Sequence, residues 1–199
     1  MALESRSIGD DLRRLLCAPA RLDLRGGLDP HDTSDAAVLV ALYLERHELG
    51  VVLTRRREDL RRHPGEISFP GGRREPGERD LRTTALREAE EEIGLDSSEV
   101  EIVGSLTATQ TITSGYCVHP FVGLIEPGRE WTPSPLEVSE VIELPLRRLR
   151  ESYARRRMVR GGVPIDTDAY VAGEHVVWGA TARILSDLLE RTGPLLAEA

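Results

Sequence analysis

Runs of apolar residues along the chain predict its strands. Residues 36–45 (AAVLVALYLE) and 50–56 (GVVLTRR) are rich in aliphatic residues, and residues 47–49 between them predict a turn. Further strands are predicted at residues 101–110, 117–126 and 140–146. Residues 57–78 contain many Gly and Pro residues, which predicts a loop.

Helical periodicity appears near both ends of the chain and in its middle. Residues 8–16 place apolar side chains on one stripe, and residues 80–93 predict a second helix. Residues 147–157 are basic and predict an amphipathic surface helix. Residues 175–193 predict the most regular helix, and the Gly-Pro pair at 193–194 is expected to end it. One face of that helix is expected to carry Val177, Thr181, Ile184, Leu185 and Leu188.

Predicted strands and helices alternate irregularly, which favours a compact α/β sheet flanked by helices over a repeating βαβ array. We divide the chain into an N-terminal helix and linker packed on the domain (1–34), a main domain (35–193) and a C-terminal tail (194–199). Of the 199 residues, 40% are hydrophobic and 30% are charged, and this composition is typical of one globular domain.

Charge and cysteine content exclude several classes of protein. The net charge of -8 argues against general nucleic-acid binding, although local arginine clusters can hold a phosphate-rich small molecule. Two cysteines are too few for a disulfide scaffold or a zinc cluster, and Cys117 is expected to lie in the core. Residues 1–25 show no apolar signal core, and no apolar run approaches a membrane span, so we expect a cytoplasmic protein without a membrane partner.

Residues 86–95 (LREAEEEIGL) place four glutamates within five positions. On a helix, Glu88, Glu91 and Glu92 lie at i, i+3 and i+4, so their carboxylates converge on one surface, whereas Glu90 lies off it. This surface is either a solvated acidic face or a site for a hard cation such as Mg²⁺ or Mn²⁺. A bound cation would offset the repulsion between the carboxylates.

Residues 72–95 (GRREPGERDLRTTALREAEEEIGL) resemble the Nudix box, which runs Gly, five residues, Glu, seven residues, then Arg-Glu-aliphatic-x-Glu-Glu-x-Gly-aliphatic. The matching positions are Gly72, Glu78, Arg87, Glu88, Ala89, Glu91, Glu92, Gly94 and Leu95. Eight residues, not seven, separate Glu78 from Arg87, so Asp80 is an alternative for the position of Glu78. Ala89 is small for its aliphatic position.

The preceding residues 52–72 (VLTRRREDLRRHPGEISFPGG) resemble the signature of the coenzyme A pyrophosphatase branch of the Nudix family. The matching positions are Leu53, Thr54, Arg55, Arg61, Gly65, Phe69, Pro70, Gly71 and Gly72. Arg57 departs from the Ser that this branch usually has in that region. Residues 135–138, 145–146 and 178–183 resemble the same branch. The resemblance therefore covers residues 35–190.

The resemblance implies an α/β fold, the Nudix α/β/α sandwich around a mixed β-sheet, here with added N-terminal and C-terminal helices. It also implies diphosphate hydrolysis with Mg²⁺ or Mn²⁺ as the cofactor. The implied metal ligands are Glu88, Glu91, Glu92 and the main-chain carbonyl of Gly72. Arg87 is expected to orient a glutamate through charge-assisted hydrogen bonds.

Substrate contacts are implied for the loop before the box. Arg55, Arg61 and His63 are candidates for phosphate binding, and a solvated basic loop is the alternative explanation. Phe69 and Gly71 complete the candidate substrate-binding set. Gly71 lets the backbone approach a phosphate or a metal, where a side chain would block it.

The general base is a separate question. Some Nudix enzymes use a glutamate of the box through the metal, and others use an acid from a later loop. Glu137 and Glu140 are the later acids of this chain, and Glu140 is preferred. Solvent-facing acids at a strand edge are the alternative interpretation of both.

Three functions remain open at this point. The first, which we favour, is hydrolysis of coenzyme A or a derivative to 3′,5′-ADP and 4′-phosphopantetheine or its acyl form. The second keeps the chemistry but acts on ADP-ribose or another nucleoside diphosphate derivative. The third is a catalytically silent module that senses a nucleotide. A homodimer is a further expectation from the resemblance.

Overall fold

The computed structural model describes residues 2–16, 22–23, 34–111, 115–160 and 162–197. The helices are α1 (Ala2–Leu16), α2 (Leu81–Ile93), α3 (Leu146–Glu151), α4 (Gly179–Arg191) and α5 (Gly193–Ala197), with a 3₁₀ helix at Ser97–Glu99. The strands of the large sheet are β1 (Leu22–Asp23), β2 (Ser34–Glu45), β3 (Glu48–Arg56), β4 (Ile67–Ser68), β5 (Gly71–Arg73), β6 (Glu101–Ser105), β7 (Ala108–Gln110), β8 (Tyr116–Ile125) and β9 (Val138–Pro145). The strands of the small sheet are β10 (Tyr153–Arg160), β11 (Val163–Ala172) and β12 (His175–Trp178).

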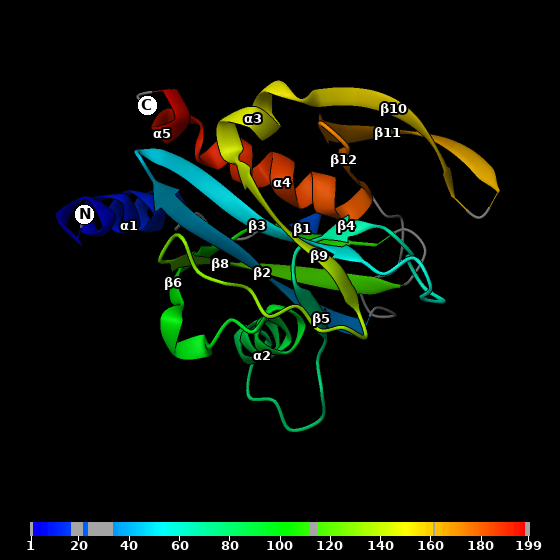
Figure 1. Cartoon of the computed structure of the whole chain (residues 1–199), viewed down its shortest axis with the longest axis horizontal. Helices are drawn as coiled ribbons and strands as arrows, with labels where there is room; N and C mark the ends of the chain where they lie inside the picture. The colour runs from blue at the N-terminus through cyan, green and yellow to red at the C-terminus, as the bar shows by residue number, and fades with distance from the viewer. Residues whose placement is uncertain (1, 17–21, 24–33, 112–114, 161, 198–199) are drawn as a thin grey trace.

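The large sheet is mixed and lies between two layers (Figure 1). Its central strand β2 runs parallel to β8 and antiparallel to β3, and β9 pairs with the other side of β3. Helix α2 covers one face of the sheet, whereas helix α4 and the small sheet lie on the opposite face (Figure 1). This architecture confirms the predicted α/β fold around a mixed sheet.

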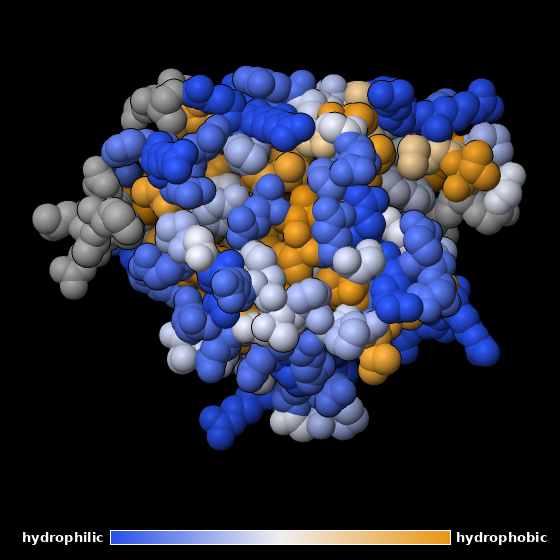
Figure 2. All heavy atoms as spheres, viewed as in Figure 1, coloured by the Kyte–Doolittle hydropathy of each residue, from blue (hydrophilic) through white to orange (hydrophobic). Residues whose placement is uncertain are grey.

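Strand β2 is buried on both of its faces. Leu39 and Ala41 belong to the core under α2, whereas Val40 and Leu42 belong to the core under α4. A strand that is covered on both faces needs apolar residues at successive positions, which explains the continuous apolar run. On the face shown in Figure 2, hydrophilic residues surround a central strip of hydrophobic ones, in the part of the view where the strands of the large sheet lie.

The prediction of a helix at residues 147–157 is wrong for most of this range. Helix α3 covers only the beginning of this range, and strand β10 follows it. Strand β10 pairs with β11, with Arg155 opposite Asp168 and Arg157 opposite Asp166. Opposite charges across a strand pair are favourable. The pairing depends on residues of β11, which the helical periodicity within residues 147–157 does not report.

The helix predicted at residues 175–193 begins too early. Its first four residues form strand β12, and α4 starts at Gly179, whose φ of 68° separates the strand from the helix. Val177 is still buried, as a residue of the strand. The turn between β2 and β3 also differs from the prediction, because it consists of Arg46 and His47.

Helix α1 and the burial of Cys117 agree with the predictions from the sequence. Leu12 and Leu16 of helix α1 are buried in the core under α4, and Cys117 is buried in strand β8. Within the described residues, we find no helix that combines the length and the apolar character needed to cross a membrane.

Helix α2 has a defined beginning and end. The Asp80 carboxylate accepts hydrogen bonds from the Thr83 backbone N–H at 2.9 Å and from the Thr83 hydroxyl at 3.1 Å. This cap satisfies one of the N–H groups that the first turn of a helix leaves without a partner. Gly94 ends the helix in the left-handed conformation, with a φ of 69°. The glutamates between these two points are therefore held at fixed positions beside the sheet.

Candidate active site

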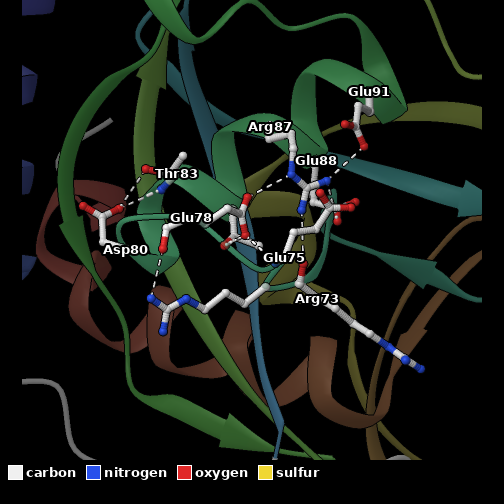
Figure 3. Close-up of polar contacts among 10 residues, drawn as sticks. Arg73, Glu75, Glu78, Asp80, Thr83, Arg87, Glu88 and Glu91 are labelled. Carbon is white, nitrogen blue, oxygen red and sulfur yellow. Dashed lines mark hydrogen bonds and ion pairs between the residues drawn. The ribbon is translucent and has the colours of Figure 1, made fainter.

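Arg87 lies at the centre of the acidic cluster on helix α2 (Figure 3). Its Nε donates to Glu78 Oε1 at 2.9 Å, and its Nη1 lies 3.0 Å from both Glu88 Oε1 and Glu91 Oε2. Its Nη2 donates to the main-chain carbonyl of Arg73 at 3.1 Å. One guanidinium therefore joins the helix, the loop before it and strand β5, which is the arrangement that an orienting arginine requires.

The structure distinguishes Glu78 from Asp80 at the front of the motif (Figure 3). The Glu78 carboxylate accepts from the Glu75 backbone N–H and from the Thr84 hydroxyl, each at 2.6 Å, besides its bond from Arg87. Burial alone would raise the pKa of Glu78, but these hydrogen bonds lower it. Asp80 instead caps the helix, so Glu78 and not Asp80 is the acid that contacts Arg87.

Glu92 is the most buried of the three candidate metal-binding glutamates, with 5% of its surface exposed. Its Oε2 accepts from the Gly71 backbone N–H at 3.3 Å, and its Oε1 lies 3.7 Å from Arg56 Nη1. Burial raises the pKa of Glu92 to about 8; Arg56 opposes this shift, and the carboxylates of Glu88 and Glu137 add to it. The charge of Glu92 is therefore poorly compensated by the protein.

Glu88 lies directly against Gly72. A Cβ atom added to Gly72 would lie 2.3 Å from Glu88 Oε1, so a side chain at this position would displace the Glu88 carboxylate. Burial raises the pKa of Glu88, although the charge and the hydrogen bond of Arg87 oppose the shift. The carboxylate of Glu88 and the main chain of Gly72 are thus neighbours, as the predicted set of ligands requires.

This set of donors fits a divalent cation of the Mg²⁺ type. Such ions prefer oxygen ligands, which the half-buried Glu88, the buried Glu92, the exposed Glu91 and the carbonyl of Gly72 supply. Among the described residues, no three acidic, histidine or cysteine side chains are already arranged around one metal position. Binding of an ion therefore requires rotation of these side chains, and it would relieve the uncompensated charge of Glu92.

Arg55 and Arg56 face different parts of the molecule. Arg56 approaches the buried Glu92, as described above. Arg55 donates from its Nε to Glu140 Oε2 at 2.9 Å, and its Nη2 lies 2.8 Å from Nδ1 of His175 in strand β12. The guanidinium of Arg55 thus joins β3, β9 and β12. The arginine beside the candidate metal ligands is Arg56, which was not among the predicted substrate contacts.

The alternation of side chains along β3 explains this difference. Val52 belongs to the core under α2 and Leu53 to the core under α4, so Arg55, two residues after Leu53, points toward α4. The pairing with β9 shifts its register between Arg55 and Arg56. Strand alternation was the available signal that separates the two arginines.

Glu140 does not lie with the glutamates of α2, which corrects the preference for it as the general base. It pairs with Arg55 across strands β3 and β9, on the face of the sheet toward α4. Glu137 lies just before β9, and its Oε2 is 3.6 Å from Arg56 Nη2. Its charge contributes to the raised pKa of Glu92. Glu137 is therefore the later acid beside the cluster.

A cavity of about 210 Å³ adjoins the cluster at Gly71 and Arg56. Two further residues of the predicted substrate-binding set, His63 and Phe69, also line it. Arg61 is exposed and is not among the residues that line this cavity. The structure thus brings His63, Phe69 and Gly71 together and separates Arg61 from them.

Replacing Glu92 with Gln should stabilise the protein at alkaline pH when metal is removed. The pKa of Glu92 is about 8 in the folded protein, whereas that of an ordinary solvated glutamate is 4.5. The folded state therefore binds the proton more tightly than the unfolded state. The contribution of Glu92 to stability is therefore full at low pH and is lost as the pH rises toward about 8.

Unfolding by denaturant in EDTA, at several pH values, measures this effect. Between about pH 5 and about pH 8, wild type should lose on the order of 1–2 kcal/mol more of its free energy of unfolding than Glu92→Gln does. Parallel pH profiles for the two proteins would contradict the assignment of an uncompensated charge to Glu92.

Comparison with known proteins agrees with this geometry. A family model described as the NUDIX domain matches residues 33–160. The uncharacterized Nudix hydrolase NudL of Photorhabdus laumondii subsp. laumondii is 36% identical over 143 residues, which are 71% of this chain and 76% of that protein. NudL of Salmonella paratyphi B is 36% identical over 160 residues, which are 79% of this chain and 82% of that protein.

A solved structure shows the same fold. The MutT/nudix family protein from Enterococcus faecalis superposes with a TM-score of 0.54 at 16% identity, covering 84% of this chain and 64% of that chain. The match to the family model and the identity to the two relatives extend over most of the chain, including the helix with the acidic cluster. The chain therefore belongs to the Nudix family and is a Nudix hydrolase.

Proposed function

We propose that the protein hydrolyses the diphosphate bond of coenzyme A or of one of its derivatives. The products would be 3′,5′-ADP and 4′-phosphopantetheine or its acyl form. Residues 52–72 support this substrate, because they resemble the signature of the coenzyme A pyrophosphatase branch. The observation that carries the proposal is the position of Arg56, which approaches the buried Glu92 and also lines the adjoining cavity. A phosphate-rich substrate in that cavity would lie beside the carboxylates.

Nudix hydrolases generally use divalent metal ions. We propose Mg²⁺ or Mn²⁺ for this protein, held by Glu88, Glu91, Glu92 and the main-chain carbonyl of Gly72. When bound, such an ion neutralises charge on the diphosphate and lowers the pKa of a water molecule.

The residues of the chain perform the remaining tasks. Arg87 keeps the carboxylates of Glu88 and Glu91 in place through the contacts in Figure 3. Arg56 is positioned to pair with a phosphate oxygen next to the carboxylates. Glu137, beside Arg56, is the proposed base that takes the proton of the attacking water. Attack of this water on phosphorus breaks the diphosphate bridge and releases two phosphate monoesters.

Two other functions would use the same site. Hydrolysis of ADP-ribose or another nucleoside diphosphate derivative requires the same carboxylates but no contact for the 3′-phosphate of coenzyme A. A silent nucleotide sensor requires no carboxylate cluster, and the repulsion within the cluster would then reduce stability without a benefit. Membership in a family of hydrolases and the complete set of glutamates favour an enzyme.

Product analysis after incubation with coenzyme A and Mg²⁺ or Mn²⁺ tests the proposal. Wild type should release 3′,5′-ADP and 4′-phosphopantetheine only when metal is present. Glu92→Gln should be slower by at least about 100-fold, because it removes a carboxylate from the proposed metal site. Glu90→Gln is the matched control, since Glu90 is exposed on the same helix, and its rate should equal that of wild type.

ADP-ribose is the control substrate in this experiment. Cleavage of ADP-ribose without cleavage of coenzyme A would contradict the proposed substrate but not the chemistry. If wild type cleaves neither compound in the presence of metal, the proposed activity is wrong.

Replacing Arg56 with Gln should lower kcat/KM for coenzyme A by about tenfold or more, because a hydrogen bond to a charged group contributes about 1.5–3 kcal/mol. Arg61→Gln is the control, because Arg61 is exposed and lies outside the residues that line the cavity. Steady-state kinetics on both variants show which of the two arginines contacts a phosphate of the substrate. A larger loss at Arg61 than at Arg56 would support the phosphate contact that the sequence predicts instead.

A further inference from the structure

The cavity beside Gly71 has an apolar wall that includes the indole of Trp178. Val38 and Val118 come from the neighbouring strands β2 and β8, and Ile184 comes from helix α4. Trp178, at the end of β12 and directly before α4, lines the same space. A wall of aliphatic side chains with an indole suits a flat ring, because aromatic side chains stack on nucleobases.

The polar part of the cavity lining contains basic side chains besides three that carry hydroxyl groups. Arg56, His63 and Arg183 line it, and Glu66 is the one acid among the described lining residues. The Arg183 Nη2 donates to the main-chain carbonyl of Gln110, and His63 Nδ1 lies 2.8 Å from Glu66 Oε2. Both basic side chains are therefore held in place by neighbours. The guanidinium groups of Arg56 and Arg183 favour a ligand that carries phosphate.

The two halves of the proposed substrate differ in shape and in charge. The nucleoside half has a rigid purine ring and, in coenzyme A, a 3′-phosphate, whereas the pantetheine half is a flexible arm without charge. The cavity of about 210 Å³ is smaller than sites that enclose whole ligands, which hold roughly 300–1,000 Å³. It therefore has room for one half, and its aromatic wall and basic groups match the nucleoside half.

We propose that this cavity binds the nucleoside half of the diphosphate substrate, with the purine ring against Trp178 and the 3′-phosphate near Arg183. This inference rests on the proposed function, because it assumes a purine nucleoside diphosphate derivative as the substrate. Gly71 and Arg56 connect the cavity with Glu92, since both line it and both approach that carboxylate. The diphosphate then extends from the cavity toward the glutamates of α2.

The two tryptophans of the chain make a direct test available. Trp178 lines the cavity, whereas Trp131 does not and instead donates from its Nε1 to Glu143, with Arg129 over its ring. In a Trp131→Phe variant, fluorescence that is excited beyond the absorption of tyrosine reports on Trp178 alone. This variant is titrated in EDTA with adenosine 5′-monophosphate, 3′,5′-ADP and 4′-phosphopantetheine, so that binding is measured without turnover.

Adenosine 5′-monophosphate and 3′,5′-ADP should both quench the fluorescence of Trp178 to saturation. The second nucleotide should bind about fivefold more tightly, because its additional phosphate pairs with a basic side chain. In contrast, 4′-phosphopantetheine should leave the fluorescence unchanged. An Ala180→Leu substitution narrows the cavity at the first turn of α4 and should weaken nucleotide binding at least about tenfold without changing Tm.

Quenching by 4′-phosphopantetheine, or no quenching by either nucleotide, would overturn the assignment of the cavity. Equal affinity for the two nucleotides would overturn the position given to the 3′-phosphate. These outcomes are separate from the proposed function. Nucleotide binding at Trp178 without hydrolysis of coenzyme A would contradict the proposed substrate alone, and hydrolysis without such binding would contradict the assignment of the cavity alone.

Discussion

Burial of carboxylates against the large sheet is the constraint on which the site depends. Glu88 and Glu92 lie where water solvates them poorly, and burial raises the pKa of both. Arg87 offsets part of this charge, and because it also bonds Glu78 it fixes the loop before the helix to the helix itself. The protein compensates the charge of Glu92 least, and this residue lies deepest in the cluster. A cation among these oxygens would complete the compensation.

The two glycines of strand β5 are packed closely against their neighbours. A side chain at Gly71 would collide with the main chain of Ala37, at 2.4 Å from its carbonyl oxygen, and one at Gly72 would collide with Glu88. The backbone of Gly71 bonds Glu92 on one side and borders the cavity on the other. Strand β5 therefore lies between the carboxylates and the cavity.

Features that depend on local sequence were predictable, and features that depend on distant pairing were not. The strand at residues 36–45 is evident because burial on both faces makes it continuously apolar. The glutamates at 88–92 converge through helical periodicity alone. Strand β10 was missed, because the arginines at 155–157 conceal the alternation and its partner lies in β11. Alternation along β3 indicates the side of the sheet on which Arg56 lies, but the approach of Glu137 to it depends on the pairing of β3 with β9, which no local pattern reports.

Direct binding of Mn²⁺ in the absence of substrate tests the central claim that the α2 glutamates form a cation site. The paramagnetic signal of the free ion measures this binding by titration. Wild type should bind Mn²⁺ saturably, and Glu88→Gln should bind it at least about tenfold more weakly, because it removes one oxygen ligand. Equal affinity of wild type and Glu88→Gln, or no binding by wild type, would contradict the claim.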